Sequence, residues 1–260
     1  QVFLDDFAVY GTRGEHFGHL RIFLKWHRPS CLSRNPARCA FGVTNEALLG
    51  HIVSEGIAVD PNKIKAIVEA KTPSNAKALS HFLEQIRWHN RMLRYLADFA
   101  TPMRTVVHHT SFKWTAAEDK AYEALKIMLT QAPVVQPPDW TRSLHMFVDA
   151  SGIAIYSVIM HLTKPNWYWP VYYSSCKLSN AEQNYSTTEH EALGMIYNIN
   201  KFWHYLLRRK FMFLVEHARL LYLVEKQALT RKIARLMLLF REFEFTIQHQ
   251  LGTQHTTMPH

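Results

Sequence analysis

The chain has 260 residues, of which 48% are hydrophobic, so it can bury a substantial core and is globular rather than disordered. It carries 30 Lys plus Arg against 21 Asp plus Glu, a net charge of +9, which favours a polyanionic partner such as nucleic acid, although a basic protein without such a partner shows the same balance. No apolar run approaches the roughly 18 residues of a membrane span, no signal-peptide pattern opens the chain, and the three cysteines form no metal-spaced pair; we therefore expect an intracellular protein of the cytoplasm or nucleus, neither secreted nor in a membrane.

The first sixty residues alternate short apolar runs with turns. Two such runs flank Asp5 and Asp6 within residues 1–11, which predicts a β-hairpin with the acidic pair at its turn. Helical spacing of apolar residues predicts a helix over 14–29, and short strands are expected around 39–43 and 48–53. Because the chain starts at Gln1 inside what reads as a strand, we expect it to be a piece of a longer product.

The pattern then turns helical from residue 61 to about 132. Leu79, Phe82, Leu83 and Ile86 form a stripe typical of a packed helix, and Thr115 with Glu118 forms a capping box that begins a further helix. The proline-rich segment 132–139 reads as a linker. The change from short strands to helices at about residue 61 and the linker before residue 139 predict three parts, which are residues 1–60, 61–138 and 139–260.

The last part has an α/β pattern. Strands are expected over 144–149, 154–161, 167–174, 211–215 and 243–249, and helices over 220–225 and 231–240. A second capping box, formed by Ser186 and Glu189, begins a long helix.

Three acidic residues lie at ends of the predicted strands or near the start of the long helix, where regular structure would fix their positions. Asp149 and Glu216 end strands, and Glu191 lies in the first turns of the long helix, where Glu189 already has a capping role. Carboxylates that converge can hold two Mg²⁺ ions, which activate a water and stabilise the leaving oxygen of a phosphodiester. Spacing alone, however, favours three solvated surface acids.

The motifs themselves resemble the reverse transcriptase and RNase H of gypsy-type retrotransposon polyproteins. In chain order the resemblance is carried by residues 3–6 (FLDD), 32–41 (LSRNPARCAF), 49–54 (LGHIVS), 112–114 (FKW), 131–135 (QAPVV), 147–151 (FVDAS), 184–193 (NYSTTEHEAL) and 216–217 (EH). It implies an α/β (α+β) fold, in which a truncated palm (1–60) and a helical thumb and connection (61–138) precede an RNase H-like mixed five-stranded sheet with helices (139–260).

The resemblance also assigns roles to residues. Asp5 and Asp6 resemble the metal-binding pair of the polymerase, whereas Asp149 and Glu191 resemble the first two RNase H ligands. Positions 216 and 259 correspond to two further family aspartates. The implied cofactor is Mg²⁺ at a two-metal site, and the implied partners are an RNA–DNA hybrid and the missing upstream polymerase segment of the same polyprotein.

The sequence departs from the family at several of these positions. Position 216 is Glu, position 259 is Pro, and a bulky Tyr156 and Arg208 replace family glycines, which predicts backbone strain at Tyr156 and a cost at Arg208 if its φ is positive. With the upstream palm absent, we expect no polymerisation by this chain and an impaired ribonuclease.

Two alternatives remain open. One is an active Mg²⁺-dependent ribonuclease H that uses Asp149, Glu191 and Glu216. The other is a non-catalytic nucleic-acid-binding module, for which the candidate contacts are basic residues in two clusters, although a solvated surface explains them equally well: Arg208, Arg209, Lys210, Arg231, Lys232 and Arg235.

Overall fold

The computed structural model describes residues 2–3, 6–9, 11–12, 14–29, 35, 39–108, 111–164, 167–216, 240 and 242–249. The chain divides into two compact units, residues 1–43 and residues 44–260, and each is considered by itself. The finer division at residues 60 and 138 stays a prediction. The helix predicted over 220–225 lies outside the described residues, as does the helix predicted over 231–240 except for its last residue, Phe240.

The first unit contains the predicted hairpin and helix. Strands β1 (Val2–Phe3) and β2 (Asp6–Phe7) pair antiparallel, and α1 spans His16–His27. The ring of Phe7 contacts those of Phe23 and His27, with centroids 5.5 and 4.7 Å apart, and so joins the hairpin to the helix.

The second unit opens with a three-stranded antiparallel sheet of β3 (Glu46–Leu48), β4 (His51–Val53) and β5 (Ile57–Val59). The strand expected at 39–43 is wrong, because these residues lie in no strand and Phe41 and Val43 are exposed. Such a short apolar run becomes a strand only where a partner strand pairs with it. Strand β5 was not predicted.

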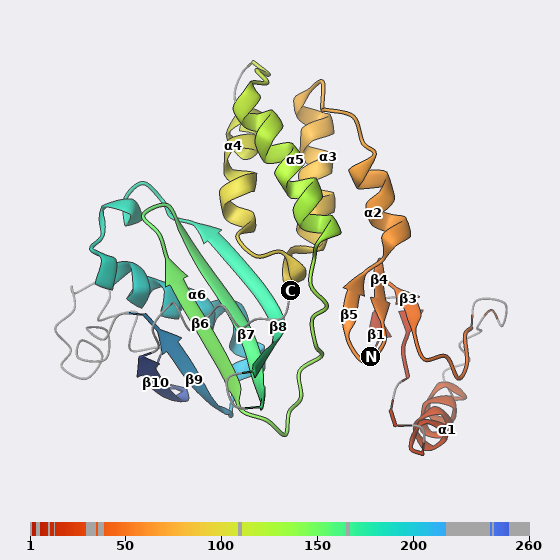
Figure 1. The fold of residues 1–260 in the computed structure, drawn as a ribbon. Coiled ribbons are helices and arrows are strands. Elements are labelled where there is room, and N and C mark those ends of the chain that lie inside the picture. Colours follow the sequence, from red (N-terminus) through yellow and green to blue (C-terminus); the bar gives the residue numbers. More distant parts are fainter. Residues whose placement is uncertain are drawn as a thin grey trace. The chain divides into compact units, whose positions relative to one another are not determined.

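The helical region is confirmed over its predicted span (Figure 1). It consists of α2 (Pro61–Val68), α3 (Ala76–Trp88), α4 (Leu96–His108) and α5 (Ala116–Thr130), and the capping box of Thr115 and Glu118 begins α5 as predicted. Leu79, Phe82 and Ile86 are buried, whereas Leu83 is half-buried.

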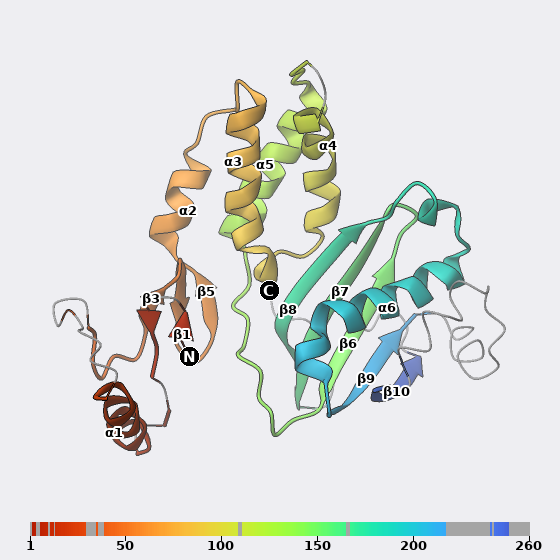
Figure 2. The ribbon, with the colours of Figure 1, turned by 180° about the vertical axis from the view of Figure 1, so that it is seen from behind.

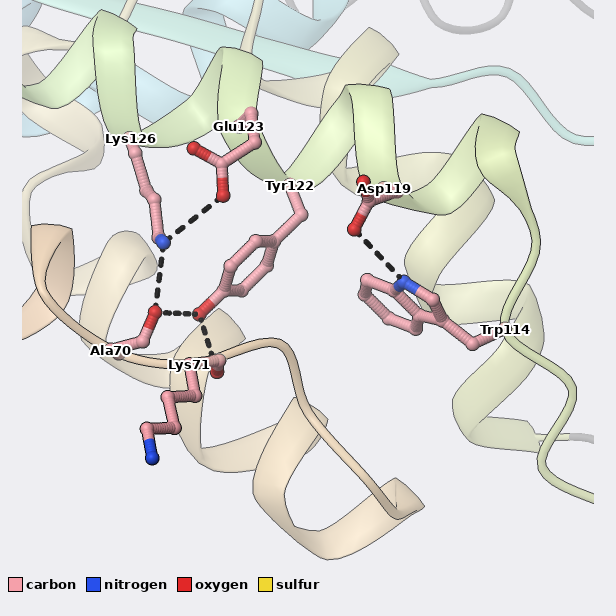
Figure 3. Close-up of polar contacts among 7 residues, drawn as sticks. All are labelled: Ala70, Lys71, Trp114, Asp119, Tyr122, Glu123 and Lys126. Atoms are coloured by element: carbon pink, nitrogen blue, oxygen red, sulfur yellow. Dashed lines mark hydrogen bonds and ion pairs between the residues drawn. The ribbon is translucent and has the colours of Figure 1, made fainter.

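Helix α5 is tied to the segment after α2 by polar contacts (Figure 3). The Tyr122 hydroxyl donates to the carbonyl of Lys71 at 3.1 Å, and the ammonium of Lys126 donates to the carbonyl of Ala70 at 2.8 Å and pairs with Glu123 at 3.1 Å. Burial raises the pKa of the Tyr122 phenol, so the hydroxyl keeps the proton that it donates.

The proline-rich segment is more than a linker. Val135 is fully buried and exchanges backbone hydrogen bonds with Ile57 of β5, and the amide of Gln136 donates to the carbonyl of Pro170 at 2.8 Å. Backbone pairing and burial therefore fix this segment, which its composition could not indicate.

A five-stranded mixed sheet follows, in the order β10-β9-β6-β7-β8 (Figure 1). Strand β6 (Leu144–Ala150) pairs antiparallel with β7 (Ala154–Lys164) and parallel with β9 (Lys210–Val215), while β8 (Trp167–Lys177) and β10 (Glu244–His249) form the edges. Helix α6 (Thr187–Leu206) lies across one face, as Figure 2 shows. The predicted α/β fold with a mixed five-stranded sheet is confirmed.

The two faces of this sheet belong to different cores. Val148 and Ile159 pack with α6, whereas Phe147, Val158 and Met160 share one buried cluster with the helices α2 to α5. This division follows from the period of two along a strand. In the part of the chain that the model describes, none of the helices combines the length and apolarity that crossing a membrane requires.

Candidate active site

Asp149 is the sixth residue of β6 and is exposed, following a run of buried strand residues. Alternation along the strand directs Val148 towards α6 and places Phe147 and Asp149 on the opposite face. The strand thus presents a carboxylate at its C-terminal end on a rigid support.

Glu216 directly follows β9. The parallel register pairs Val148 with Val215, so the next residue of each strand, Asp149 and Glu216, lies at the same edge. Both carboxylates line one hollow of about 220 Å³. The other lining residues are Arg94, Tyr95, Phe147, Val148, Tyr156, Ser157, Val158, Tyr173 and Ser174.

Tyr156 stands directly opposite Asp149 in the β6–β7 register. Its hydroxyl donates to the carboxylate of Asp98 at 2.5 Å, and its ring meets that of Tyr95 edge-on with centroids 4.8 Å apart. Burial, followed by the bond to Asp98, raises the pKa of Tyr156 to about 12. The strain predicted at this position is wrong, because Tyr156 is an ordinary residue of β7 and the positive φ angles of the described non-glycine residues occur elsewhere.

Glu191 lies in α6 and is only 4% exposed. The capping box forms as predicted, since the Glu189 carboxylate accepts from the backbone N–H of Ser186 at 3.0 Å. At Gly194 the helix approaches β6 so closely that an added Cβ would lie 2.5 Å from a methyl carbon of Val148. Glu191 thus belongs to the helix that covers one face of the sheet. The acidic residues that line the hollow, among those that the structure describes, are Asp149 and Glu216.

Magnesium is the metal that carboxylates of this kind would hold. No group of three or more His, Cys, Asp or Glu side chains is arranged to hold a metal ion within residues 39–108, 111–164, 167–216 and the shorter described stretches. Asp149 and Glu216 together fit an ion that keeps several waters, because Mg²⁺ is commonly bound through one or two carboxylates.

Two residues of the basic cluster Arg208, Arg209 and Lys210 make contacts within the chain. The Arg209 guanidinium lies 4.4 Å from the ring centroid of Trp140 and donates to its carbonyl at 2.9 Å, and Lys210 pairs with Glu244 at 2.6 Å. Arg208 is exposed and has a φ of 59°. The condition under which a cost was expected at this position, a positive φ, is therefore met.

Several predicted site residues lie outside the described part of the chain: Asp5, the side chain of Asp6, Arg231, Lys232, Arg235 and Pro259. In contrast, Arg94 and Tyr95 were missed by sequence reasoning, although they line the hollow. Their position in a helical region gave no signal, because they reach the hollow only through the packing of that region on the sheet.

Comparisons with known proteins agree with this geometry. Residues 114–213 match the RNase H-like domain found in reverse transcriptase. The Tf2-3 and Tf2-7 transposon polyproteins of Schizosaccharomyces pombe are 26% identical to the chain over 258 residues, which cover 96% of the chain but only 19% of each relative.

Solved structures give the same fold. The foamy viral protease-reverse transcriptase in complex with dsDNA superposes with a TM-score of 0.82 at 17% identity, covering all of this chain and 55% of that one. Its complex with an RNA/DNA hybrid gives a TM-score of 0.81 at 17% identity and covers 36% of that chain. The chain is thus similar to the reverse transcriptase and RNase H-like region of retrotransposon polyproteins, as its motifs predicted.

Proposed function

From this similarity to retrotransposon polyproteins, we propose that the chain binds nucleic acid as a reverse transcriptase–RNase H region in which ribonuclease H catalysis is impaired. The observation that carries the proposal is the pair Asp149 and Glu216, which share one hollow at the end of adjacent parallel strands. An RNA–DNA hybrid is the substrate class, and gypsy-type ancestry and the polymerase activity of a longer polyprotein belong to the same proposal.

The residues present argue for impairment in three ways. Glu216 carries one more methylene than the family aspartate, which displaces its carboxylate at a site where Mg²⁺ demands near-ideal geometry at about 2.0–2.1 Å. Pro259 offers no ligand in place of a further aspartate. Glu191 is buried within α6 and is not among the residues that line the hollow.

The site that remains has fewer carboxylate ligands for Mg²⁺ than the family's site. Two bound Mg²⁺ ions would supply an activated water and stabilisation of the leaving oxygen. In this chain Asp149 and Glu216 would hold an ion at the ends of β6 and β9, whose backbones pair in parallel up to Val148 and Val215.

The proposal is tested by incubating the chain with a labelled RNA–DNA hybrid in Mg²⁺ or Mn²⁺. We expect no cutting above the background of Asp149→Asn, because that substitution replaces one of the two carboxylates of the hollow by an amide of the same size. Robust cutting that Asp149→Asn abolishes would contradict the proposal and establish the alternative, an active ribonuclease H.

A repair variant sharpens the same assay. We expect Glu216→Asp combined with Pro259→Asp to cut the hybrid faster than the parent, because two family ligands return. The matched control adds Asp149→Asn to the repaired chain, which should return cutting to background. A repaired chain that stays inactive while binding the hybrid would show that the impairment has another cause.

A further inference from the structure

Arg94 shares the hollow with Asp149 and Glu216 although it lies more than fifty residues earlier in the chain. It lies two residues before Leu96, the first residue of α4, and is exposed. Its guanidinium lies 4.7 Å from the ring centroid of Tyr95 and forms no ion pair with any residue that the model describes, the two carboxylates of the hollow included.

The backbone that carries Arg94 is held in an unfavourable conformation. Tyr95 has a φ of 58°, in the left-handed region that a bulky aromatic residue seldom adopts. Such a conformation persists only where surrounding contacts determine it, and it is concentrated at functional sites.

The contacts that fix this segment come from the sheet. The Tyr156 hydroxyl donates to Asp98, the hydroxyl of Ser175 accepts from the backbone N–H of Ala97 at 2.9 Å, and Arg91 donates to the carbonyl of Val171 at 2.9 Å. Hydrogen bonds on both sides of Arg94 thus attach its segment to β7 and β8, beside the carboxylates.

The chemistry of these three charges is complementary to a phosphodiester. Carboxylates collect divalent cations but repel the phosphate, whereas a guanidinium binds phosphate oxygens through paired N–H donors. Placing both kinds of charge in one hollow lets a single site hold the metal and the strand.

We propose that Arg94 is a phosphate-binding residue that holds a nucleic-acid strand against the Asp149 and Glu216 carboxylates. The inference rests on the proposed function for the identity of the ligand, and it assigns to the helical region a direct contact at the RNase H-like site.

The test measures binding and requires no catalysis. A fluorescein-labelled RNA–DNA hybrid is titrated with the whole chain in EDTA, and anisotropy gives the dissociation constant at several salt concentrations. We expect Arg94→Ala to weaken binding about tenfold, because bonds to charged groups contribute enough for one decade of affinity. The slope of log K against log salt should fall in magnitude by about 0.9 if one phosphate contact is lost and the strand behaves like duplex DNA.

Two further variants define the contact. Arg94→Lys keeps the charge but loses the planar fork, so its affinity should lie between those of the parent and Arg94→Ala. Arg87→Ala is the matched control, since Arg87 is an exposed arginine of α3 that pairs with Glu84 and does not line the hollow. It should bind as the parent does. Circular dichroism verifies that all variants are folded.

The outcomes separate the two proposals. A parent that binds and an Arg94→Ala variant with the same affinity and salt slope would overturn the role of Arg94 alone. Equal losses in Arg94→Ala and Arg87→Ala would also overturn it, because they would show only a general effect of charge. A parent that does not bind the hybrid would overturn the proposed function as well.

Discussion

Arg208 and Arg209 are adjacent in the sequence, but they affect the stability of the fold in different ways. Arg208 has a φ of 59°, where the Cβ of any residue other than glycine is crowded by the backbone. Arg209 stacks on Trp140 and donates to its carbonyl, so its side chain attaches the start of β9 to the segment before β6. The equal charge of the two arginines therefore does not indicate how much each contributes to the stability of the fold.

Replacing Arg208 by glycine should stabilise the fold. The left-handed conformation costs a non-glycine residue about 1–2 kcal/mol, and the greater freedom of glycine in the unfolded chain offsets about half of this. We expect a net gain of about 0.5–1 kcal/mol, measured as a higher urea midpoint.

The neighbouring Arg209→Ala variant is the control for this position. It removes the stacking and the hydrogen bond, so its midpoint should fall by the equivalent of about 1 kcal/mol. If Arg208→Gly also lowered the midpoint, the side chain of Arg208 would have to stabilise the fold through a contact that outweighs its backbone strain.

At the scale of elements, α6 approaches β6 closely at Gly194. Gly194 permits it, since a Cβ there would lie 2.5 Å from a methyl carbon of Val148 and 3.5 Å from one of Ile155. The approach also sets the distance between Glu191, three residues earlier on the helix, and the end of β6 that carries Asp149.

We expect Gly194→Ala to destabilise the chain. Overpacking costs about 1–3 kcal/mol, and replacing glycine within a helix gains about 1 kcal/mol, so we expect a net loss of up to about 2 kcal/mol. Denaturant unfolding followed by circular dichroism measures the difference.

Gly18→Ala in α1 supplies the matched control, because nothing lies within 4 Å of a Cβ added there. Only the helical gain of about 0.5–1 kcal/mol applies to it. A Gly194→Ala variant as stable as Gly18→Ala would mean that Val148 and the helix adjust without cost.

At the scale of the second unit, the helical region and the sheet share a buried cluster. Leu79, Met103 and Leu125 of the helices belong to it together with Met160 and Leu214 of the strands. An apolar cluster that spans both regions makes the burial of each depend on the other.

Truncating Met160 should consequently weaken both regions. Met160 is fully buried, and Met160→Ala should cost about 2–5 kcal/mol through lost burial and the cavity left behind. Hydrogen exchange should show faster exchange of amides in α4 and in β7 by a similar factor. Faster exchange in β7 with unchanged protection of α4 would contradict the coupling.

Local patterns were sufficient for the helices of the second unit and for the strands of the five-stranded sheet. Both capping boxes, at Thr115 and Ser186, begin helices as predicted, because each is satisfied by residues within one turn. The strand expected at 39–43 and the unpredicted β5 mark the limit, since strands of three residues depend on partners that local sequence does not name.

The sequence by itself determined the helical region, the strands of the five-stranded sheet, the resemblance to a retrotransposon reverse transcriptase with RNase H, and Asp149 and Glu216 as acids at strand ends. These properties follow from periodicity, caps and motifs, which are local in the chain. Only the tertiary structure decided that Tyr156 lies unstrained beside Asp149, that Glu191 is buried, and that Arg94 enters the same hollow. The physical reason is that packing and hydrogen bonds between distant segments determine these positions, and no local pattern records them.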